Sequence, residues 1–294
     1  MFRLMLSSHP EIHVFGEFEE AVSRLGDTGW VDLSEYHAFL RLNRAAIAHG
    51  FLVDRSLSYP DLVRDFFGQA RSRTTKPVVG AAIHSRFDRC PDLFPGANYL
   101  HVLRDPRDVA ESCVAMGWAG NVYYGAETWV VAERRWDALC RRVPASNRHE
   151  VRYEDLVAQP EHVLRGVCRF VGVPFRREML DYHQASSYGP PDPSGAQRWR
   201  QRSRPRDIQL VEHRCGPFLT QRGYEVSGLA PYQPARGGRL LLMADNRVRR
   251  AQASVRKYGA VFWTVERLAR IAGIRRIQET IQLRRNELDA ATLK

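Results

Sequence analysis

Long hydrophobic runs are absent from this sequence of 294 residues. Its most apolar stretch, residues 258–274, is interrupted by Glu266, Arg267 and Arg270, whereas a membrane-spanning helix needs about 18 consecutive apolar residues. The apolar run within residues 1–8 is too short for a secretory signal peptide, and no small-residue cleavage site follows it. The sequence therefore argues against a transmembrane protein, and we expect a cytoplasmic chain.

Closely spaced cysteines are also missing. The five cysteines stand 23 to 47 residues apart, at positions 90, 113, 140, 168 and 215. A metal clip needs at least one pair separated by only a few residues. We therefore expect reduced, mostly structural thiols and no bound metal.

Lysine is rare, although the chain is basic. Of the 44 lysines and arginines only three are lysine, and the formal net charge is +11. A basic surface favours nucleic-acid binding, because it releases counterions from phosphates. Most of the excess charge, however, lies in residues 239–294, which hold 13 basic and 5 acidic residues. Finger spacings, a helix-turn-helix and RNA-binding sheet motifs are absent as well, so we expect no nucleic-acid partner.

What the chain does contain is an alternation of strand and helix patterns. Hydrophobic residues make up 44% of it, enough for a sizeable core. The short apolar runs 78–83 and 99–103 are typical of strands buried in a parallel sheet, and amphipathic segments predict helices between and after them, as at 35–49, 128–142 and 205–222. We predict an α/β fold, a parallel β-sheet flanked by helices, over residues 1–230. Residues 231–294 are expected to form a linker and a basic helical tail.

The most informative local pattern is Leu-Arg-Asp-Pro-Arg-Asp at residues 103–108. Asp105 is a good N-cap and Pro106 suits the first helical position, so a helix is expected to follow the strand at once. Arg104 then lies at the carboxyl end of a buried strand, where open α/β sheets bind their ligands. With the hydroxyl of Ser112 it could hold the oxygens of a phosphate. On spacing alone, a capping arginine and an exposed serine explain the pattern equally well.

Several segments in order resemble the sulfotransferases that use 3'-phosphoadenosine 5'-phosphosulfate. Residues 92–108 are similar to the segment that leads into the family's 3'-phosphate motif. Within that motif, Arg104 and Ser112 match the arginine and serine that hold the phosphate. The run Arg-Tyr-Glu-Asp-Leu at 152–156 is similar to a motif whose tyrosine, here Tyr153, lies beside the nucleotide. Residues 197–200 resemble a loop whose basic residue, here Arg198, returns to the 3'-phosphate. The resemblance spans about residues 1–225 and implies the P-loop nucleotide-kinase-like fold of that family.

One element of the family pattern is not found. In the family, a strand and a glycine-rich phosphosulfate loop precede a helix like the one expected at residues 2–10, and here Met1 stands where that loop would just have ended. Two explanations stay open: the start is assigned too far downstream, or the chain is a variant with impaired catalysis. We favour the first and expect the upstream DNA to continue in frame with a short strand and a Gly/Ser/Thr-rich loop.

Two residues compete for the role of catalytic base. His84 follows the strand at 78–83, as the catalytic histidine does in cytosolic sulfotransferases, but Ala82 stands where that subgroup has a lysine. Glu17, after Gly16, resembles a glutamate that can act as base in protein-tyrosine and many bacterial members. Either residue could instead be an ordinary polar group at a strand end.

The resemblance implies transfer of a sulfuryl group from 3'-phosphoadenosine 5'-phosphosulfate, without a metal, to a hydroxyl or amine of a small-molecule, glycan or lipid acceptor. Five aromatic residues could line the acceptor cleft or belong to the core: Trp118, Tyr123, Tyr124, Trp129 and Trp136. A second hypothesis is a catalytically impaired binding protein that associates with an anionic membrane surface or a partner. That contact would use residues 239–294, where arginines alternate with apolar residues as they do in interfacial helices, and would make the chain membrane-peripheral. Packing of the tail onto the domain is the other reading of the same pattern.

Overall fold

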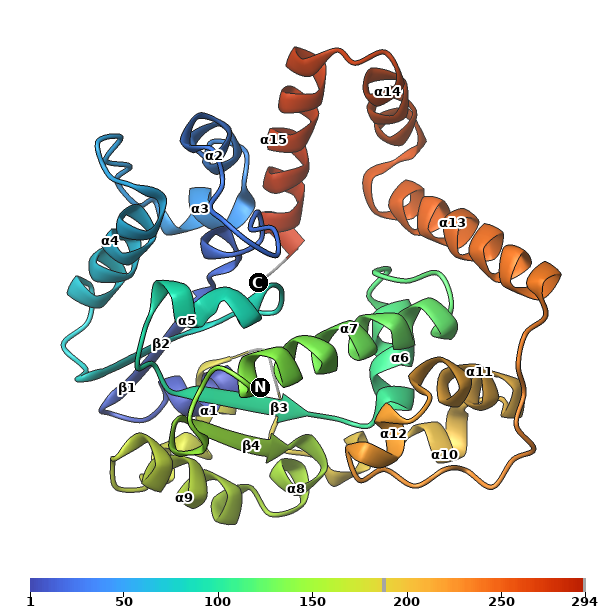
Figure 1. Cartoon of the computed structure of the whole chain (residues 1–294), viewed down its shortest axis with the longest axis horizontal. Coiled ribbons are helices and arrows are strands. Elements are labelled where there is room, and N and C mark those ends of the chain that lie inside the picture. The colour runs from blue at the N-terminus through green and yellow to red at the C-terminus, as the bar shows by residue number, and fades with distance from the viewer. Residues whose placement is uncertain (187–188, 293–294) are drawn as a thin grey trace.

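The computed structural model describes residues 1–186 and 189–292 and has an α/β architecture (Figure 1). Four strands form two parallel pairs: β1 (Ile12–Glu17) with β2 (Val78–Ala82), and β3 (Tyr99–Leu103) with β4 (Arg148–Arg152). Among the described residues no backbone ladder joins one pair to the other. The predicted fold class, parallel strands flanked by helices, is confirmed.

Both strand pairs lie in one layer between two apolar clusters. Val78 and Leu100 pack on the cluster that includes α1 (Phe2–Ser7) and α9 (Pro160–Val171). Their neighbours Val79 and Tyr99 pack on the cluster that includes α2 (Leu33–Leu40) and α4 (Tyr59–Ser72). Successive side chains of a strand point to opposite faces, so this alternation gives each face of the layer its own core. Helices lie on both sides of the layer, but the predicted burial of the strands is incomplete. In β2 and β3 only Leu103 is buried, and Val102 is 43% exposed.

The described residues that precede the tail form twelve α-helices and several short 3₁₀ turns. The α-helices that precede the tail are α1 (Phe2–Ser7), α2 (Leu33–Leu40), α3 (Arg44–His49), α4 (Tyr59–Ser72), α5 (Cys90–Leu93), α6 (Pro106–Ala115), α7 (Val122–Cys140), α8 (Tyr153–Ala158), α9 (Pro160–Val171), α10 (Trp199–Arg202), α11 (Pro205–Cys215) and α12 (Phe218–Gln221). Short 3₁₀ turns are η1 (Glu19–Ala21), η2 (Phe87–Arg89), η3 (Ala145–Asn147), η4 (Arg177–Met179), η5 (Tyr182–Ala185) and η6 (Pro193–Gly195). At α6 the predicted cap is present, because the carboxylate of Asp105 accepts the N–H of Arg107 at 2.9 Å.

Three predicted helices have other boundaries in the structure. The segment 35–49 is two helices, because Asn43 accepts the N–H of Ala46 and starts α3 as a new N-cap. The segment 205–222 is also divided, at Gly216, whose φ of 54° ends α11. Helix α7 begins at Val122 rather than at 128, capped by the side chain of Asn121.

The C-terminal segment forms α13 (Arg236–Tyr258), α14 (Ala260–Ile271) and α15 (Arg275–Thr292). Figure 1 shows these helices as an arch that leaves the body after α12 and returns to it beside α2 and α3. Helix α13 is held at Gly120, whose N–H donates to Asn246 at 2.7 Å. Helix α15 is held at Leu42, whose carbonyl accepts from Asn286 at 2.9 Å. The packing interpretation of the tail is therefore correct for both ends of the arch. None of the described helices is long and apolar enough to cross a membrane.

Candidate functional site

The first part of the candidate site lies where β3 and β4 end. Leu103 and Arg152 are register partners on these parallel strands, so the residues that follow them, Arg104 and Tyr153, emerge side by side. The guanidinium carbon of Arg104 lies 4.3 Å from the centre of the Tyr153 ring. Arg104 Nη2 also donates to the carbonyl of Gly195 at 3.0 Å. Strand register thus brings two predicted nucleotide-binding residues together, and a distant loop joins them.

Arg198 belongs to the same group. A Cβ at Gly195 would lie 3.0 Å from the hydroxyl of Tyr153 and 3.7 Å from Arg198 Nη2, so both side chains flank the backbone at this point. Arg198 Nε donates to the carbonyl of Ser194 at 3.0 Å, which turns its guanidinium toward the loop that contains Gly195. Three of the four predicted nucleotide-binding residues therefore gather around one stretch of backbone. Ser112 lies on α6 with an exposed side chain.

The loop that contains Arg198 is held down by Trp199. The backbone N–H of Trp199 donates to Asp108, and its indole N–H donates to Asp105, each at 3.0 Å. The guanidinium carbon of Arg107 lies 3.6 Å from the centre of the indole ring, and Arg107 is itself bonded to both oxygens of Asp105. Asp105 and Arg107 thus have a structural role that the sequence patterns did not reveal. The lone tryptophan in a basic, proline-rich loop was the available signal.

The polar groups around Arg104 are only partly paired. Among the described residues, Arg104 Nε and Asp108 Oδ2 are buried and have no hydrogen-bond partner. The closest approach between these two side chains, from Arg104 Nη2 to Asp108 Oδ2, is 3.9 Å. Burial raises the pKa of Asp108, partly offset by the Trp199 N–H and the charge of Arg104. Arg104 Nε is thus an unsatisfied buried donor, and Asp108 Oδ2 beside it is an unsatisfied buried acceptor.

The two candidate bases lie at the end of the other strand pair. Glu17 is the register partner of Ala82, and His84 follows two residues later. Glu17 is 49% exposed and its carboxylate lies 2.8 Å from Arg44 Nη2, at the start of α3. His84 is exposed, and its backbone N–H donates to the carboxylate of Glu19, which also binds Ser85. Both residues are open to an acceptor, and the geometry favours neither.

Two of the five aromatic residues considered for the acceptor cleft belong to the core. Tyr123 and Trp129 are 5% and 4% exposed, and the indole N–H of Trp129 donates to the carbonyl of Arg104 at 3.0 Å. Trp136 stacks on His101 with 4.3 Å between ring centres. Tyr123 and Trp129 are therefore core residues, as the alternative interpretation predicts, and Trp129 also fixes the backbone of Arg104. Trp118 is 64% exposed.

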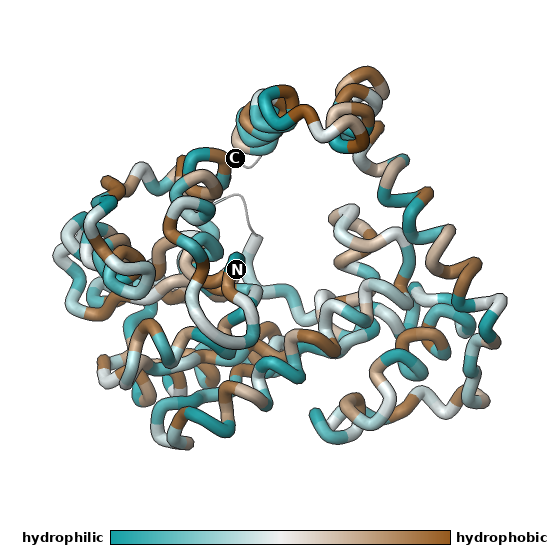
Figure 2. The backbone as a smooth tube through the Cα atoms, turned by 45° about the horizontal axis from the view of Figure 1, so that its top comes forward, coloured by the Kyte–Doolittle hydropathy of each residue, from teal (hydrophilic) through white to brown (hydrophobic). Residues whose placement is uncertain are grey.

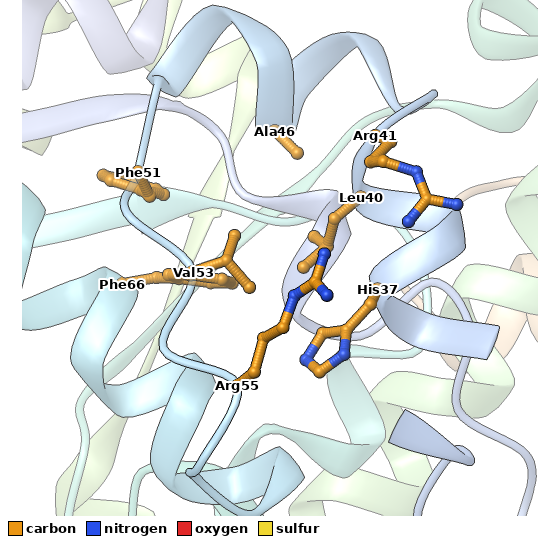
Figure 3. A pocket seen from close by; sticks show the side chains of 8 residues that line it. All are labelled: His37, Leu40, Arg41, Ala46, Phe51, Val53, Arg55 and Phe66. Carbon is orange, nitrogen blue, oxygen red and sulfur yellow. The ribbon is translucent and has the colours of Figure 1, made fainter. Parts of the chain in front are cut away.

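Two hollows are found beside α2 and α3. The first, of about 140 Å³, is lined by His37, Leu40, Arg41, Ala46, Phe51, Val53, Arg55 and Phe66 (Figure 3). It has apolar walls and two arginines, and none of the predicted site residues lines it. The second, of about 370 Å³, is lined by Phe39, Leu42, Asn43, Arg44, Gln282, Asn286 and Asp289. Because Arg44 also binds Glu17, the second hollow adjoins a candidate base.

The described residues contain no group of three or more His, Cys, Asp or Glu side chains that could hold a metal ion. All five cysteines are free thiols. Burial raises the pKa of Cys90 and Cys215 to about 12, so both remain protonated and inert at neutral pH.

Comparison with known proteins gives a consistent result. The sequence model of the sulfotransferase family matches residues 1–177. A curated relative, protein-tyrosine sulfotransferase A of Caenorhabditis elegans, is 24% identical over 193 residues, which cover 63% of this chain and 49% of that protein. The chain thus spans about half the length of this curated relative.

Two solved structures have a similar fold. The sulfotransferase domain from the curacin biosynthetic pathway superposes with a TM-score of 0.55 at 20% identity and covers 76% of this chain and 93% of its own. The sulfotransferase domain from the Synechococcus PCC 7002 olefin synthase gives a TM-score of 0.51 at 24% identity and covers 72% and 88%. At these identities the likeness concerns the fold.

Proposed function

The chain belongs to the sulfotransferase family, and from that premise we propose that it moves a sulfuryl group from 3'-phosphoadenosine 5'-phosphosulfate to a hydroxyl or amine acceptor. The observation that carries this proposal is the meeting of Arg104, Tyr153 and Arg198 around Gly195. In the proposed complex, Arg104, Arg198 and Ser112 hold the 3'-phosphate, and Tyr153 lies beside the nucleotide.

The local charge supports binding of an anion at this point. The nearest carboxylate oxygens lie 3.9 Å from Arg104 and 3.8 Å from Arg198, too far for short ion pairs. Both guanidinium groups therefore keep donors for a ligand, and planar forks of donors suit phosphate oxygens. The stack of Arg104 on Tyr153 fixes the direction in which one of these forks points.

The bound donor would supply the sulfuryl group and a good leaving group, and the chain's own residues would position the acceptor and accept its proton. In the proposed transfer, the acceptor oxygen or nitrogen forms a bond to sulfur while the bond from sulfur to the 5'-phosphate oxygen breaks. That oxygen keeps the electron pair and leaves as 3'-phosphoadenosine 5'-phosphate. Glu17 or His84 takes the acceptor's proton.

Titration calorimetry with 3'-phosphoadenosine 5'-phosphate tests the donor site. We expect binding by the wild-type chain and an affinity loss of about tenfold or more in Arg104→Ala, since a hydrogen bond to a charged group contributes roughly 1.5–3 kcal/mol. Arg165→Ala is a matched control, because Arg165 is an exposed residue of α9 that contacts Glu161 and Phe175 and none of the proposed nucleotide-binding residues. No binding at millimolar nucleotide, or equal affinity in all three proteins, would remove the proposal.

A second proposal concerns the tail, which we infer contacts an anionic membrane surface and makes the protein membrane-peripheral. The supporting observation is one exposed apolar face on α14, where Val261, Leu268 and Ile271 are 80%, 60% and 74% exposed. Figure 2 shows much of this helix in the brown of hydrophobic residues. Residues 239–294 carry 13 basic and 5 acidic residues, which complements anionic headgroups. Membrane contact would accompany catalysis.

A further inference from the structure

The hollow of about 370 Å³ is built from two segments far apart in the sequence. One wall comes from the end of α2 and the start of α3, and the other from α15, which returns to this place at the end of the arch (Figure 1). Asn286 fastens the walls together: it is only 8% exposed and donates to the carbonyl of Leu42 at 2.9 Å. The hollow is therefore a property of the docked tail, since neither wall alone encloses it.

Polar groups of both kinds face this space. Asn43 uses its carbonyl oxygen as the cap of α3, which leaves its amide nitrogen as a donor, and Arg44 uses one nitrogen for Glu17 and keeps others. On the opposite wall Gln282 donates to Asn286 at 3.0 Å, so its carbonyl oxygen is available as an acceptor. Donors thus lie on one side and an acceptor on the other.

Asp289 adds a carboxylate to the second wall. It accepts hydrogen bonds from Lys257 at 2.7 Å and from Tyr258 at 2.8 Å. Burial would raise the pKa of Asp289, but these bonds and the charges of Lys257 and Arg44 outweigh it and keep the pKa below its usual value. With one guanidinium and one carboxylate, the lining is close to neutral.

We propose that this hollow is the acceptor site and that it takes a neutral sugar unit, an inference that rests on the proposed sulfotransferase function. A sugar hydroxyl donates and accepts at once, and the amides, Arg44 and Asp289 offer partners for both. The ring of Phe39 and the side chain of Leu42 can cover the C–H face of the sugar. The volume is at the lower end of the ~300–1,000 Å³ of small-molecule sites, which suits a monosaccharide or the end of a glycan.

Other acceptor classes fit the lining less well. A lipid tail needs a mainly apolar wall, but in this hollow polar and apolar atoms share the lining, and five of the seven lining residues are polar or charged. An acidic peptide needs an excess of positive charge, and here Asp289 balances Arg44. Arg44 lines the hollow and also binds the carboxylate of Glu17. A sugar hydroxyl bound to Arg44 would therefore lie near Glu17, which makes Glu17 the base for a sugar acceptor in this proposal.

Saturation-transfer NMR with the methyl glycosides of glucose, galactose, mannose and N-acetylglucosamine tests the inference on the full chain. N-acetyltyrosinamide and hexanol serve as probes of the competing acceptor classes. We expect a signal from at least one glycoside and at least a fivefold weaker signal in Gln282→Ala and in Phe39→Ala. Arg284→Ala, an exposed change on the same helix, should leave the signal unchanged.

Calorimetry with 3'-phosphoadenosine 5'-phosphate on the same proteins separates the two proposals. If the nucleotide binds but no glycoside does, or if the glycoside signal is the same in Gln282→Ala and Phe39→Ala as in the wild type, the sugar inference is wrong and the proposed function stands. A stronger signal from N-acetyltyrosinamide or hexanol that both variants abolish would also overturn it. If the nucleotide does not bind, the proposed function fails whatever the glycosides do.

Discussion

Arg104 and Tyr153 occupy equivalent positions at the ends of two neighbouring parallel strands, and the guanidinium carbon lies 4.3 Å from the centre of the phenol ring. The pair is a consequence of strand register, since each residue directly follows a register partner. A shift of the strand register by one residue would turn one of the two side chains to the other face of the layer and remove the contact between them. The nucleotide side of the candidate site is therefore set by β3 and β4.

The Tyr153 ring is expected to contribute to nucleotide binding through its stack with Arg104. We predict that Tyr153→Leu weakens binding of 3'-phosphoadenosine 5'-phosphate two- to fivefold, because a partly exposed cation–π contact contributes about 0.5–1 kcal/mol. Tyr153→Phe keeps the ring and should bind almost as the wild type does. Calorimetry on the three proteins measures the difference, and equal losses in both variants would contradict a role for the ring.

Trp199 is predicted to be important for stability as well as for the site. Trp199→Ala removes the indole from Arg107 and Asp105, and we expect the free energy of unfolding to fall by about 3–5 kcal/mol, as for other buried tryptophans. Trp118→Ala is the control, because Trp118 is 64% exposed and its loss should cost less than about 0.5 kcal/mol. Urea unfolding gives both values. Similar losses in the two variants would show that Trp199 does not hold its loop.

His101 should make stability depend on pH. Its nitrogens lie 3.2 Å from Glu133 and 3.3 Å from Glu150, and it stacks on Trp136, while Arg222 binds the far side of Glu133. Burial lowers the pKa of His101, but the hydrogen bonds and charges of the two glutamates outweigh it and hold the pKa above its usual value of 6.5. The stabilising form is therefore the protonated one. Its contribution is complete below the unfolded-state pKa and is lost as the pH rises through the folded-state pKa.

The measurement is a set of urea unfolding curves from about pH 5.5 to about pH 9 for the wild type and His101→Gln. We expect the wild-type protein to be the more stable one at the acid end and the difference to shrink toward the alkaline end. A difference that grows with pH would contradict the assigned direction of the shift.

Gly120 is predicted to be essential for docking of the tail. A Cβ at this position would lie 2.4 Å from the carbonyl oxygen of Asn246, so Gly120→Ala forces α13 away and should cost about 1–3 kcal/mol. Gly237→Ala is the matched control on α13 itself, because a Cβ there meets nothing within 4 Å, and alanine is the better helix former. Hydrogen exchange of α13 reports the result: faster exchange is expected only in Gly120→Ala. Unchanged exchange in that variant would mean that the close approach is not needed.

The membrane proposal predicts flotation of the protein with vesicles that contain phosphatidylglycerol, and weaker flotation with phosphatidylcholine alone or at high salt. The double variant Leu268→Glu, Ile271→Glu should lose this binding, because it puts two charges on the exposed apolar face of α14. Gln252→Glu with Thr280→Glu adds the same charge at exposed positions on the neighbouring helices and should still float. Equal flotation of both double variants, or none by the wild type, would remove the proposal.

Local features of this protein were predictable because they depend on neighbours in the chain. The strand at residues 99–103 is apolar except for His101, and Asp105 with Pro106 marks the start of α6, so the α/β class and this strand–helix unit follow from the sequence. The break between α2 and α3 was less predictable, because the apolar periodicity continues across it. There the side chain of Asn43 accepts the N–H of Ala46, which starts a new helix despite the continuing periodicity.

By itself the sequence determined the fold class, the strand that presents Arg104, and the family motifs that contain Tyr153 and Arg198, since each is encoded within a few consecutive residues. Only the tertiary structure decided which of these residues meet. The bond from Arg104 to Gly195 spans 91 positions, and that from Asn286 to Leu42 spans 244. Contacts at such separations depend on how helices pack and where loops close. Neither can be inferred from the residues next to each partner in the chain.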